Sequence, residues 1–222
     1  MKTASDIPAA ERIADAALLV VDMQNDFVRT GAPLEVVEAR DTIAPIRRLI
    51  DGFRKHGRPV IYTRYLAEPS DGFRRLWSPQ CGPEMKCCWE GVLRQYDDTK
   101  DEIDCIAVID ELAPLPDDPV IDKYGYGSFH NTDLDTRLKA LGIASLVVTG
   151  TVAQICVEET AREAFHHGYR TVIASDCISS FDAELKAATL KNFAMKFGWV
   201  ADSDNVLGWL QQAETSLAHR EG

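Results

Sequence analysis

The sequence predicts an α/β fold with three α/β/α layers, built on a mostly parallel, Rossmann-like sheet of about six strands. Short apolar runs rich in β-branched residues alternate along the chain with longer segments in which apolar residues recur at helical spacing. This alternation favours parallel strands whose connecting helices cover both faces of the sheet. Neither a linker-like stretch nor an internal repeat divides the 222 residues, so we expect one domain over residues 1–222.

The first half of the chain supplies two strands, one helix and a long insertion. Residues 16–22 are predicted as the first strand because the run is apolar up to its last residue. A helix follows over about residues 37–56, and Gly57 ends it before the second strand at 59–63. Five apolar residues set the helical periodicity: Ile43, Ile46, Leu49, Ile50 and Phe53. The segment 64–104, rich in Pro, Gly, Trp and Cys, is long for a loop, so we expect a lid or an interface there.

The second half repeats the pattern of strand and helix. Four further strands are predicted, at residues 119–122, 145–149, 169–174 and 199–201. Three helices are predicted, at residues 134–141, 157–167 and 183–195. In a parallel sheet the carboxyl ends of the strands line a common crevice, so residues that follow different strands can meet there.

The composition is that of an ordinary globular chain with an acidic surplus. There are 35 acidic and 24 basic residues, which gives a formal net charge of −11. This surplus and the lack of a dense Lys or Arg run argue against nucleic-acid binding. The longest apolar runs, such as residues 16–21, are far too short to span a membrane. Residues 1–6 precede no apolar secretory core, so we expect a cytoplasmic protein with no membrane partner.

Six cysteines occur, at positions 81, 87, 88, 105, 156 and 177. Their spacing lacks the two C-x-x-C pairs typical of a zinc ribbon, because Cys87 and Cys88 are adjacent and Cys81 lies well before them. In a reducing cytoplasm we expect thiols rather than disulfides. We therefore predict neither a metal site nor a cofactor.

Cys156 is the candidate nucleophile. The apolar run before it breaks at Gly150, and a short loop brings the thiol to the start of the helix predicted at 157–167. Backbone N–H groups and the positive end of the helix dipole favour thiolate over thiol at such a position. The alternative is that Cys156 is a small apolar residue of the core, which is a common fate of free cysteine.

Two other predicted strands end at an ionisable residue. Asp22 ends the first strand, and Lys123 directly follows the strand at 119–122. At the shared edge of the sheet these groups and the Cys156 thiol would occupy one pocket, where they could shuttle protons, hold the thiolate and attack a carbonyl carbon. The alternatives are a turn or capping role for Asp22 and a solvated position for Lys123.

Three blocks of sequence resemble the isochorismatase-like cysteine hydrolases. The first is VVDMQNDF at residues 20–27, the second runs from Lys123 through residues 128–134, and the third is GTVAQICV at residues 150–157. They occur in the family's order, and the resemblance covers about residues 15–205.

The resemblance implies a set of catalytic roles. The family's triad falls on Asp22, Lys123 and Cys156. The oxyanion hole would be made by the backbone N–H groups of Val152 and Cys156, and the peptide bond between Thr151 and Val152 would be cis.

Residues in these blocks and in the insertion are candidates for contact with substrate. Six are predicted to bind it: Gln24, Phe27, Arg64, Tyr126, Phe129 and Gln154. Further aromatic and cationic candidates are Tyr65, Arg74, Arg75, Trp77, Trp89 and Tyr124. An arginine in a closed pocket would select a carboxylate through a two-pronged hydrogen bond, although some of these arginines could equally be surface charges. Asp26 either orients the site or bonds local backbone N–H groups.

Two departures from the family pattern bear on the substrate. Many relatives have a hydroxyl residue and then Asn or Asp where this chain has Ala153 and Gln154, so the polar contacts of this loop should differ. Nicotinamidases of the superfamily hold a metal through histidines soon after the second strand, but none lies between His56 and His130 here. A metal-dependent nicotinamidase is therefore not expected.

These features favour a cysteine hydrolase that cleaves the C–N bond of a small amide, carbamoyl or ureido compound through a thioester. Two alternatives remain open. A vinyl-ether hydrolase of the isochorismatase type needs an acid but no sulfur nucleophile, and a non-enzymatic binding protein on the same fold would leave the triad unexplained. We expect a homodimer or homotetramer whose ligand is a small amide-type molecule.

Overall fold

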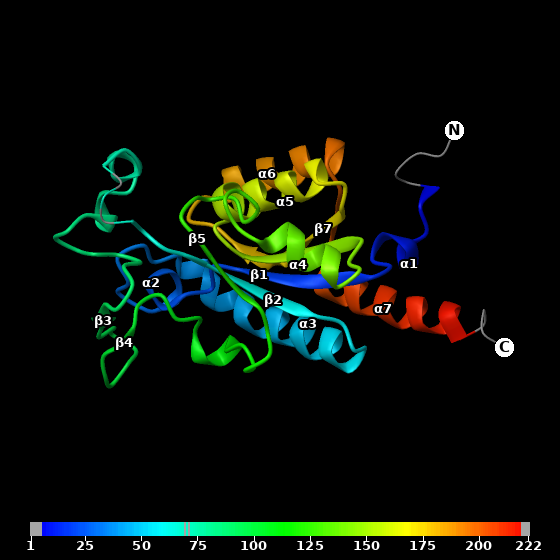
Figure 1. Cartoon of the computed structure of the whole chain (residues 1–222), viewed down its shortest axis with the longest axis horizontal. Coiled ribbons are helices and arrows are strands. Elements are labelled where there is room, and N and C mark those ends of the chain that lie inside the picture. The colour runs from blue at the N-terminus through cyan, green and yellow to red at the C-terminus, as the bar shows by residue number, and fades with distance from the viewer. Residues whose placement is uncertain (1–5, 69, 71, 219–222) are drawn as a thin grey trace.

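The computed structural model describes residues 6–68, 70 and 72–218. Its main sheet has six parallel strands in the order β5-β2-β1-β6-β7-β8. Figure 1 shows this sheet between two groups of helices. They are β1 (Ala16–Val21), β2 (Val60–Tyr65), β5 (Val120–Lys123), β6 (Ser145–Thr151), β7 (Arg170–Ser179) and β8 (Trp199–Ala201). A separate antiparallel pair is formed by β3 (Leu93–Arg94) and β4 (Ile103–Asp104). The predicted α/β class with a six-stranded parallel sheet is confirmed.

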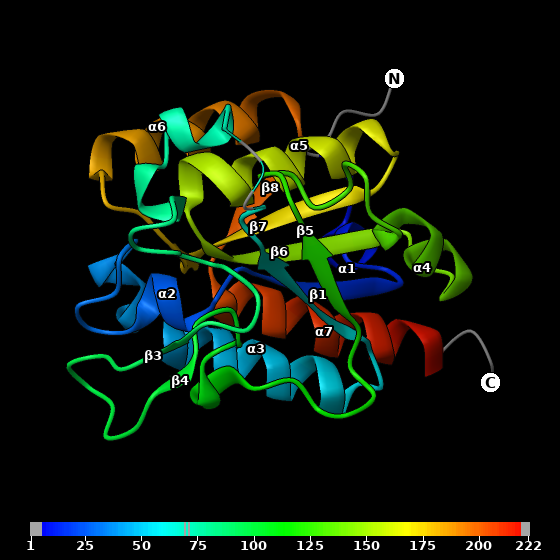
Figure 2. The same ribbon diagram turned by 60° about the vertical axis from the view of Figure 1, so that its left-hand side comes forward.

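Helices lie on both faces of the main sheet (Figure 2). The α-helices are α1 (Ala9–Arg12), α2 (Asn25–Val28), α3 (Ile43–Lys55), α4 (Leu134–Ala140), α5 (Glu158–His166), α6 (Ala183–Lys196) and α7 (Ser203–Ala218). One layer contains α3 and α7, and the opposite layer contains α4, α5 and α6. None of the helices in the described segments has both the length and the apolar character needed to cross a bilayer.

The central strand β1 is apolar throughout because both of its faces are covered. Leu18 and Val20 belong to the core under α3 and α7. The alternate residues Ala17, Leu19 and Val21 belong to the core under α4, α5 and α6. The two-residue period of a strand thus distributes one apolar run between two separate cores.

Some elements differ in extent from those predicted. The helix expected from residue 37 begins as a 3₁₀ helix, Val37–Thr42, and becomes α-helical only at Ile43. β7 continues past the expected end at 174 to Ser179, after an irregularity in its pairing with β6. Helix α7 follows β8 without having been predicted, and it packs against α3.

Gly150 allows β6 to approach β1 closely at the carboxyl edge of the sheet. It pairs with Val21, and its φ is 109°, a conformation that favours glycine. A Cβ atom at this position would lie 2.0 Å from the backbone oxygen of Val21. The glycine that breaks the apolar run is therefore required by the strand contact beside Asp22.

Asp26 attaches the insertion 64–104 to α2. Its carboxylate is fully buried and accepts three hydrogen bonds, all from the insertion. The donors are the Cys88 backbone N–H at 2.8 Å, Arg94 Nε at 2.9 Å and the Tyr96 hydroxyl at 2.7 Å. Asp26 therefore has a structural role, but through donors far away in the sequence rather than through the local backbone N–H groups that were considered.

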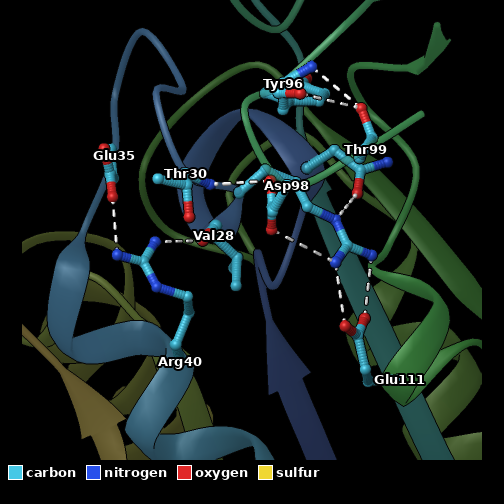
Figure 3. A network of polar contacts seen from close by, with 10 residues as sticks. Val28, Thr30, Glu35, Arg40, Tyr96, Asp98, Thr99 and Glu111 are labelled. Atoms are coloured by element: carbon cyan, nitrogen blue, oxygen red, sulfur yellow. Dashed lines mark hydrogen bonds and ion pairs between the residues drawn. The ribbon is translucent and has the colours of Figure 1, made fainter. Parts of the chain in front are cut away.

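A second network joins the end of α2 to the segments on either side of β4. Arg29 donates two 2.9 Å hydrogen bonds to the carboxylate of Glu111 and forms an ion pair with Asp98 at 3.7 Å. The backbone N–H of Thr30 also donates to Asp98, at 3.1 Å, and Figure 3 shows Thr30, Asp98 and Glu111 together. These contacts hold the insertion against the carboxyl edge of the sheet.

Removal of a core side chain should destabilise the fold measurably. Leu49 is fully buried under β1, and Leu49→Ala should lower the free energy of unfolding by about 2–5 kcal/mol, because it leaves a cavity. The matched control is Leu115→Ala, since Leu115 is an exposed leucine and should change stability by less than about 0.5 kcal/mol. Denaturant unfolding followed by circular dichroism measures both. Equal losses would contradict the assigned core.

Candidate active site

Asp22 lies immediately after β1 and is fully buried. Its φ of 50° is left-handed, a conformation that Asp adopts more readily than most residues. Its backbone N–H donates to the Thr63 carbonyl at 3.2 Å, and its Oδ1 accepts a 2.7 Å hydrogen bond from the Thr63 hydroxyl. The second oxygen, Oδ2, lies 2.7 Å from Lys123 Nζ. One oxygen is thus fixed by β2, and the other faces the cation.

Lys123 is the last residue of β5, and its side chain is fully buried. Besides the ion pair with Asp22, Nζ donates to the carbonyl oxygens of Tyr126 at 2.8 Å and Gly125 at 3.1 Å. Burial opposes the charge of this amine, but the Asp22 carboxylate and the Cys156 sulfur raise its pKa above the usual value. Lys123 is therefore a cation at rest.

Cys156 lies in a π-helical turn, Ala153–Val157, between β6 and α5. Only 4% of its surface is exposed. Burial raises the pKa of its thiol to about 12, Lys123 opposes this rise, and the Asp22 carboxylate adds to it. Together these effects favour the thiol over the thiolate.

This resting thiol differs from the thiolate that a helix N-terminus was expected to favour. The α-helix starts at Glu158, so Cys156 lies in the turn that precedes it. Two acidic residues, Glu158 and Glu159, occupy the first turn of α5. Burial beside Asp22 then has the larger effect on the pKa of the thiol.

One feature of the backbone before Cys156 is as the resemblance implied. The Thr151–Val152 peptide bond is cis. The backbone N–H of Val152 bonds to the Cys156 sulfur and slightly lowers its pKa. Val152 and Cys156 both line a cavity.

The cavity has a volume of about 340 Å³ and has Cys156 in its wall. Besides Cys156, six lining residues lie at or just after the carboxyl ends of strands: Phe27, Tyr65, Tyr126, Val152, Ile155 and Phe181. The insertion adds Trp77, Ser78 and Gln80, and the loop after α2 adds residues 33–36. The crevice expected at this edge of the sheet is therefore present.

Two of the six residues predicted to bind substrate, Phe27 and Tyr126, line this cavity. Tyr65 and Trp77, from the wider group of candidates, line it as well. The other members of that group lie outside its wall: Arg74, Arg75, Trp89 and Tyr124.

Gln24 and Arg64 have partners in the sheet and do not line the cavity. The Gln24 amide donates to the Tyr65 carbonyl at 3.0 Å and accepts from the Tyr65 N–H at 2.7 Å, so it joins the ends of β1 and β2. Arg64 forms two hydrogen bonds, at 2.7 and 2.8 Å, with the carboxylate of Asp122, its neighbour on β5. Alternation along β2 turns Arg64 away from the side that Tyr65 occupies.

Phe129 and Gln154 also lie outside the cavity wall. Phe129 is buried and packs on His167 and Tyr169, with ring centroids 4.8 and 5.8 Å apart. The Gln154 amide oxygen accepts a 2.8 Å hydrogen bond from the Ser180 hydroxyl, while its amide nitrogen is buried without a hydrogen-bond partner. In this structure Phe129 is part of the core and Gln154 contacts the segment after β7.

Sequence reasoning did not find three parts of the site. Thr63 donates a hydrogen bond to Asp22. The signal that could have identified it is its own polarity, because it is a polar residue at the expected end of an apolar strand that pairs with β1. Phe181 and residues 33–36 line the cavity from loops. No periodicity in a loop indicates which way its side chains point, so nothing in the sequence marked them.

Buried cysteines gather beside Asp26. Cys87 Sγ and Cys88 Sγ are 3.6 Å apart, and with Asp26 they form the one group in the described segments whose ligand atoms are close enough to share a metal ion. The Asp26 oxygens already accept hydrogen bonds from Cys88 N–H, Arg94 and Tyr96. A metal would have to compete with these donors, which makes the group a poor cation site.

The comparison with protein families and known proteins agrees with this geometry. Residues 16–205 match the isochorismatase domain family. A ureidoacrylate amidohydrolase RutB of Rhizobium rhizogenes is 30% identical, over 95% of this chain and 89% of that protein. Nicotinamidase 3 of Arabidopsis thaliana is 32% identical, over 86% of each chain.

Solved structures show the same fold. A cysteine hydrolase from Pseudomonas syringae superposes with a TM-score of 0.79 at 28% identity, over 93% of this chain and 95% of that one. N-carbamoylsarcosine amidase from Thermoplasma acidophilum superposes with a TM-score of 0.67 at 34% identity, over 85% and 96% of the two chains.

Alkylation should distinguish the effects of the two charged neighbours on Cys156. Asp22→Asn removes a charge that raises the thiol pKa, so iodoacetamide should label Cys156 faster at neutral pH. Lys123→Ala removes the cation that lowers this pKa, so labelling should be slower than in the unchanged protein. Mass spectrometry of the Cys156 peptide across about pH 6–10 measures the rates. Shifts in the same direction in both variants would contradict this electrostatic assignment.

Metal removal should leave the activity intact. The oxygens of Asp26 are occupied by protein donors, and the Cys156 route needs no Lewis acid. We expect unchanged turnover after dialysis against a chelator and less than about 0.1 equivalent of zinc, iron or manganese by elemental analysis. Activity lost to the chelator and restored by one metal would refute this, and Cys87→Ser would then test whether the cysteines bind it.

Proposed function

The chain belongs to the isochorismatase family, and on this premise we propose that it is a cysteine amidohydrolase that cleaves the C–N bond of a small amide, carbamoyl or ureido compound through a thioester. The observation that carries the proposal is the buried contact among Asp22, Lys123 and Cys156 in the wall of the cavity. The names of the relatives, which include amidohydrolases, an amidase and a nicotinamidase, support the same reaction class.

Acylation begins with a proton transfer within this group. Asp22 takes the thiol proton of Cys156, and the sulfur attacks the substrate carbonyl carbon to form a tetrahedral oxyanion. The backbone N–H groups of Val152 and Cys156 receive the negative charge. Asp22 then gives the proton to the leaving nitrogen, the C–N bond breaks, and ammonia or an amine departs from the thioester.

Deacylation repeats these steps with water. Asp22, again ionised, removes a proton from water, and the resulting hydroxide attacks the thioester carbonyl. When the C–S bond breaks, the proton returns from Asp22 to the sulfur, and the carboxylic acid leaves. Lys123 stays protonated throughout and stabilises both Asp22 and the developing thiolate.

The insertion 64–104 has a place in this proposal as a lid. It contributes Trp77, Ser78 and Gln80 to the cavity wall, and Asp26 anchors its second half. Because its second half is anchored and its first half lines the cavity, the insertion is suited to exclude water from the cavity after substrate binds. We do not favour a vinyl-ether hydrolase or a binding protein, because neither needs a buried thiol paired with an acid and an amine.

Cysteine substitution tests the proposed nucleophile. Cys156→Ala should lower amidase turnover by about a thousandfold or more with the fold intact, and Cys156→Ser should retain little activity. The matched control is Cys177→Ala, because Cys177 is an equally buried thiol outside the cavity wall. Release of ammonia from a panel of carboxamides and ureido acids measures turnover. Full activity in folded Cys156→Ala would refute the proposal.

A double variant tests whether the triad acts as one unit. Asp22→Asn should reduce turnover about a hundredfold or more, because it removes the proton carrier while preserving the shape of the side chain. Lys123→Ala should be comparably damaging. The fold-loss of turnover in the double variant should be far smaller than the product of the two single fold-losses. Fully multiplicative losses in folded protein would mean that the two residues do not serve the same step.

A further inference from the structure

Apolar and aromatic side chains make up most of the cavity wall. The pair next to the nucleophile is Val152 and Ile155, and Phe27, Tyr65 and Leu34 extend the same surface. Ser78 and Gln80 from the insertion are uncharged. A ligand in this cavity therefore exchanges water largely for hydrocarbon and ring surface.

Within the segments that the structure describes, one charged side chain lines the cavity, and it is the acidic Glu35. Arg40 holds it in an ion pair at 2.7 Å and donates at 2.8 Å to the Val28 carbonyl, as Figure 3 shows. The Gly31 backbone N–H donates to the other carboxylate oxygen at 3.0 Å. Arg40 is thus engaged by two acceptors and does not line the cavity.

Four further cations lie near the site but outside the cavity wall: Lys123 and Arg64 are engaged elsewhere, and Arg74 and Arg75 line a separate small cavity. Lys123 binds Asp22 and two backbone carbonyls, which uses all three of its N–H donors. Arg64 is held by Asp122 outside the cavity wall. A carboxylate that entered the cavity would lose its hydration without gaining a cationic partner from the cavity wall.

From this wall we infer that the substrate is a neutral amide with an apolar alkyl or aryl acyl group, and that the cavity rejects amides that also carry a carboxylate. The inference rests on the proposed function and makes its substrate class specific. It separates this chain from relatives named for ureidoacrylate, which is itself a ureido acid.

Two aromatic residues at the cavity suit the apolar part of such a substrate. Trp77 and Phe181 both line the cavity, although 70% and 65% of their surfaces are exposed. Trp77 comes from the insertion and Phe181 from the segment after β7, so an acyl group that extends outward from Cys156 would contact both. Contact with them removes apolar surface of the protein, as well as of the ligand, from water.

Matched amides test the inference directly. Benzamide, its 4-carboxylate and 3-ureidopropionate would be compared by ammonia release, and the neutral amide should have a kcat/KM at least about tenfold above either acid. Higher kcat/KM for an acid would overturn the inference and leave the proposed function standing. If no compound is turned over, calorimetry should measure the binding of each compound to the Cys156→Ala protein. The inference requires the neutral amide to bind more tightly than either acid, and tighter binding of an acid overturns it.

A charge introduced into the wall tests the cause of the preference. Gln80→Arg places a cation in the cavity and should raise kcat/KM for the carboxylate-bearing amide at least about tenfold relative to benzamide. The matched control is Gln95→Arg, which adds the same charge to an exposed position of the insertion outside the cavity wall. The control should keep the preference for benzamide. An unchanged preference in Gln80→Arg, or an equal shift in both variants, would refute the electrostatic cause.

Discussion

The buried ion pair between Asp22 and Lys123 is the interaction on which the rest of the site depends. Removing two charges from water costs several kcal/mol for each ion, and the cost is recovered only where the geometry is close and the remaining polar groups are satisfied. Here Thr63 binds the acid, and two carbonyls bind the amine. These partners belong to β2 and to the turn after β5, so the pair requires that β1, β2 and β5 end together.

The same pair explains why the thiol needs its neighbours. A cysteine buried this deeply holds its proton, and the nearby carboxylate strengthens that hold. Lys123 counteracts both effects. The site thus holds a protonated thiol beside a base. Loss of the thiol proton becomes favourable only when a substrate carbonyl can take up the negative charge and the backbone donor at Val152 can stabilise it.

Much of this arrangement could be predicted from the sequence because it follows strand ends. Asp22, Lys123 and Cys156 each follow an apolar run, and parallel strands bring such positions together. Arg64 also lies at a strand end, and alternation places it on the opposite face of β2 from Tyr65, but the sequence does not specify which of these faces lines the cavity. Loop residues such as Phe181 have no periodic signal, and helix α7 was overlooked although its buried residues Val206, Leu210 and Ala213 are at helical spacing.

The distribution of tryptophans makes the insertion observable without a label. Of the four tryptophans in the chain, Trp77 and Trp89 lie in the insertion, whereas Trp199 of β8 and Trp209 of α7 pack with Arg12. Trp89 is held by a 2.8 Å hydrogen bond from its indole N–H to the Cys81 carbonyl, but the ring of Trp77 is mostly in water. Intrinsic fluorescence therefore contains one solvated emitter beside the cavity, and ligand that covers this ring would shift the emission towards shorter wavelength.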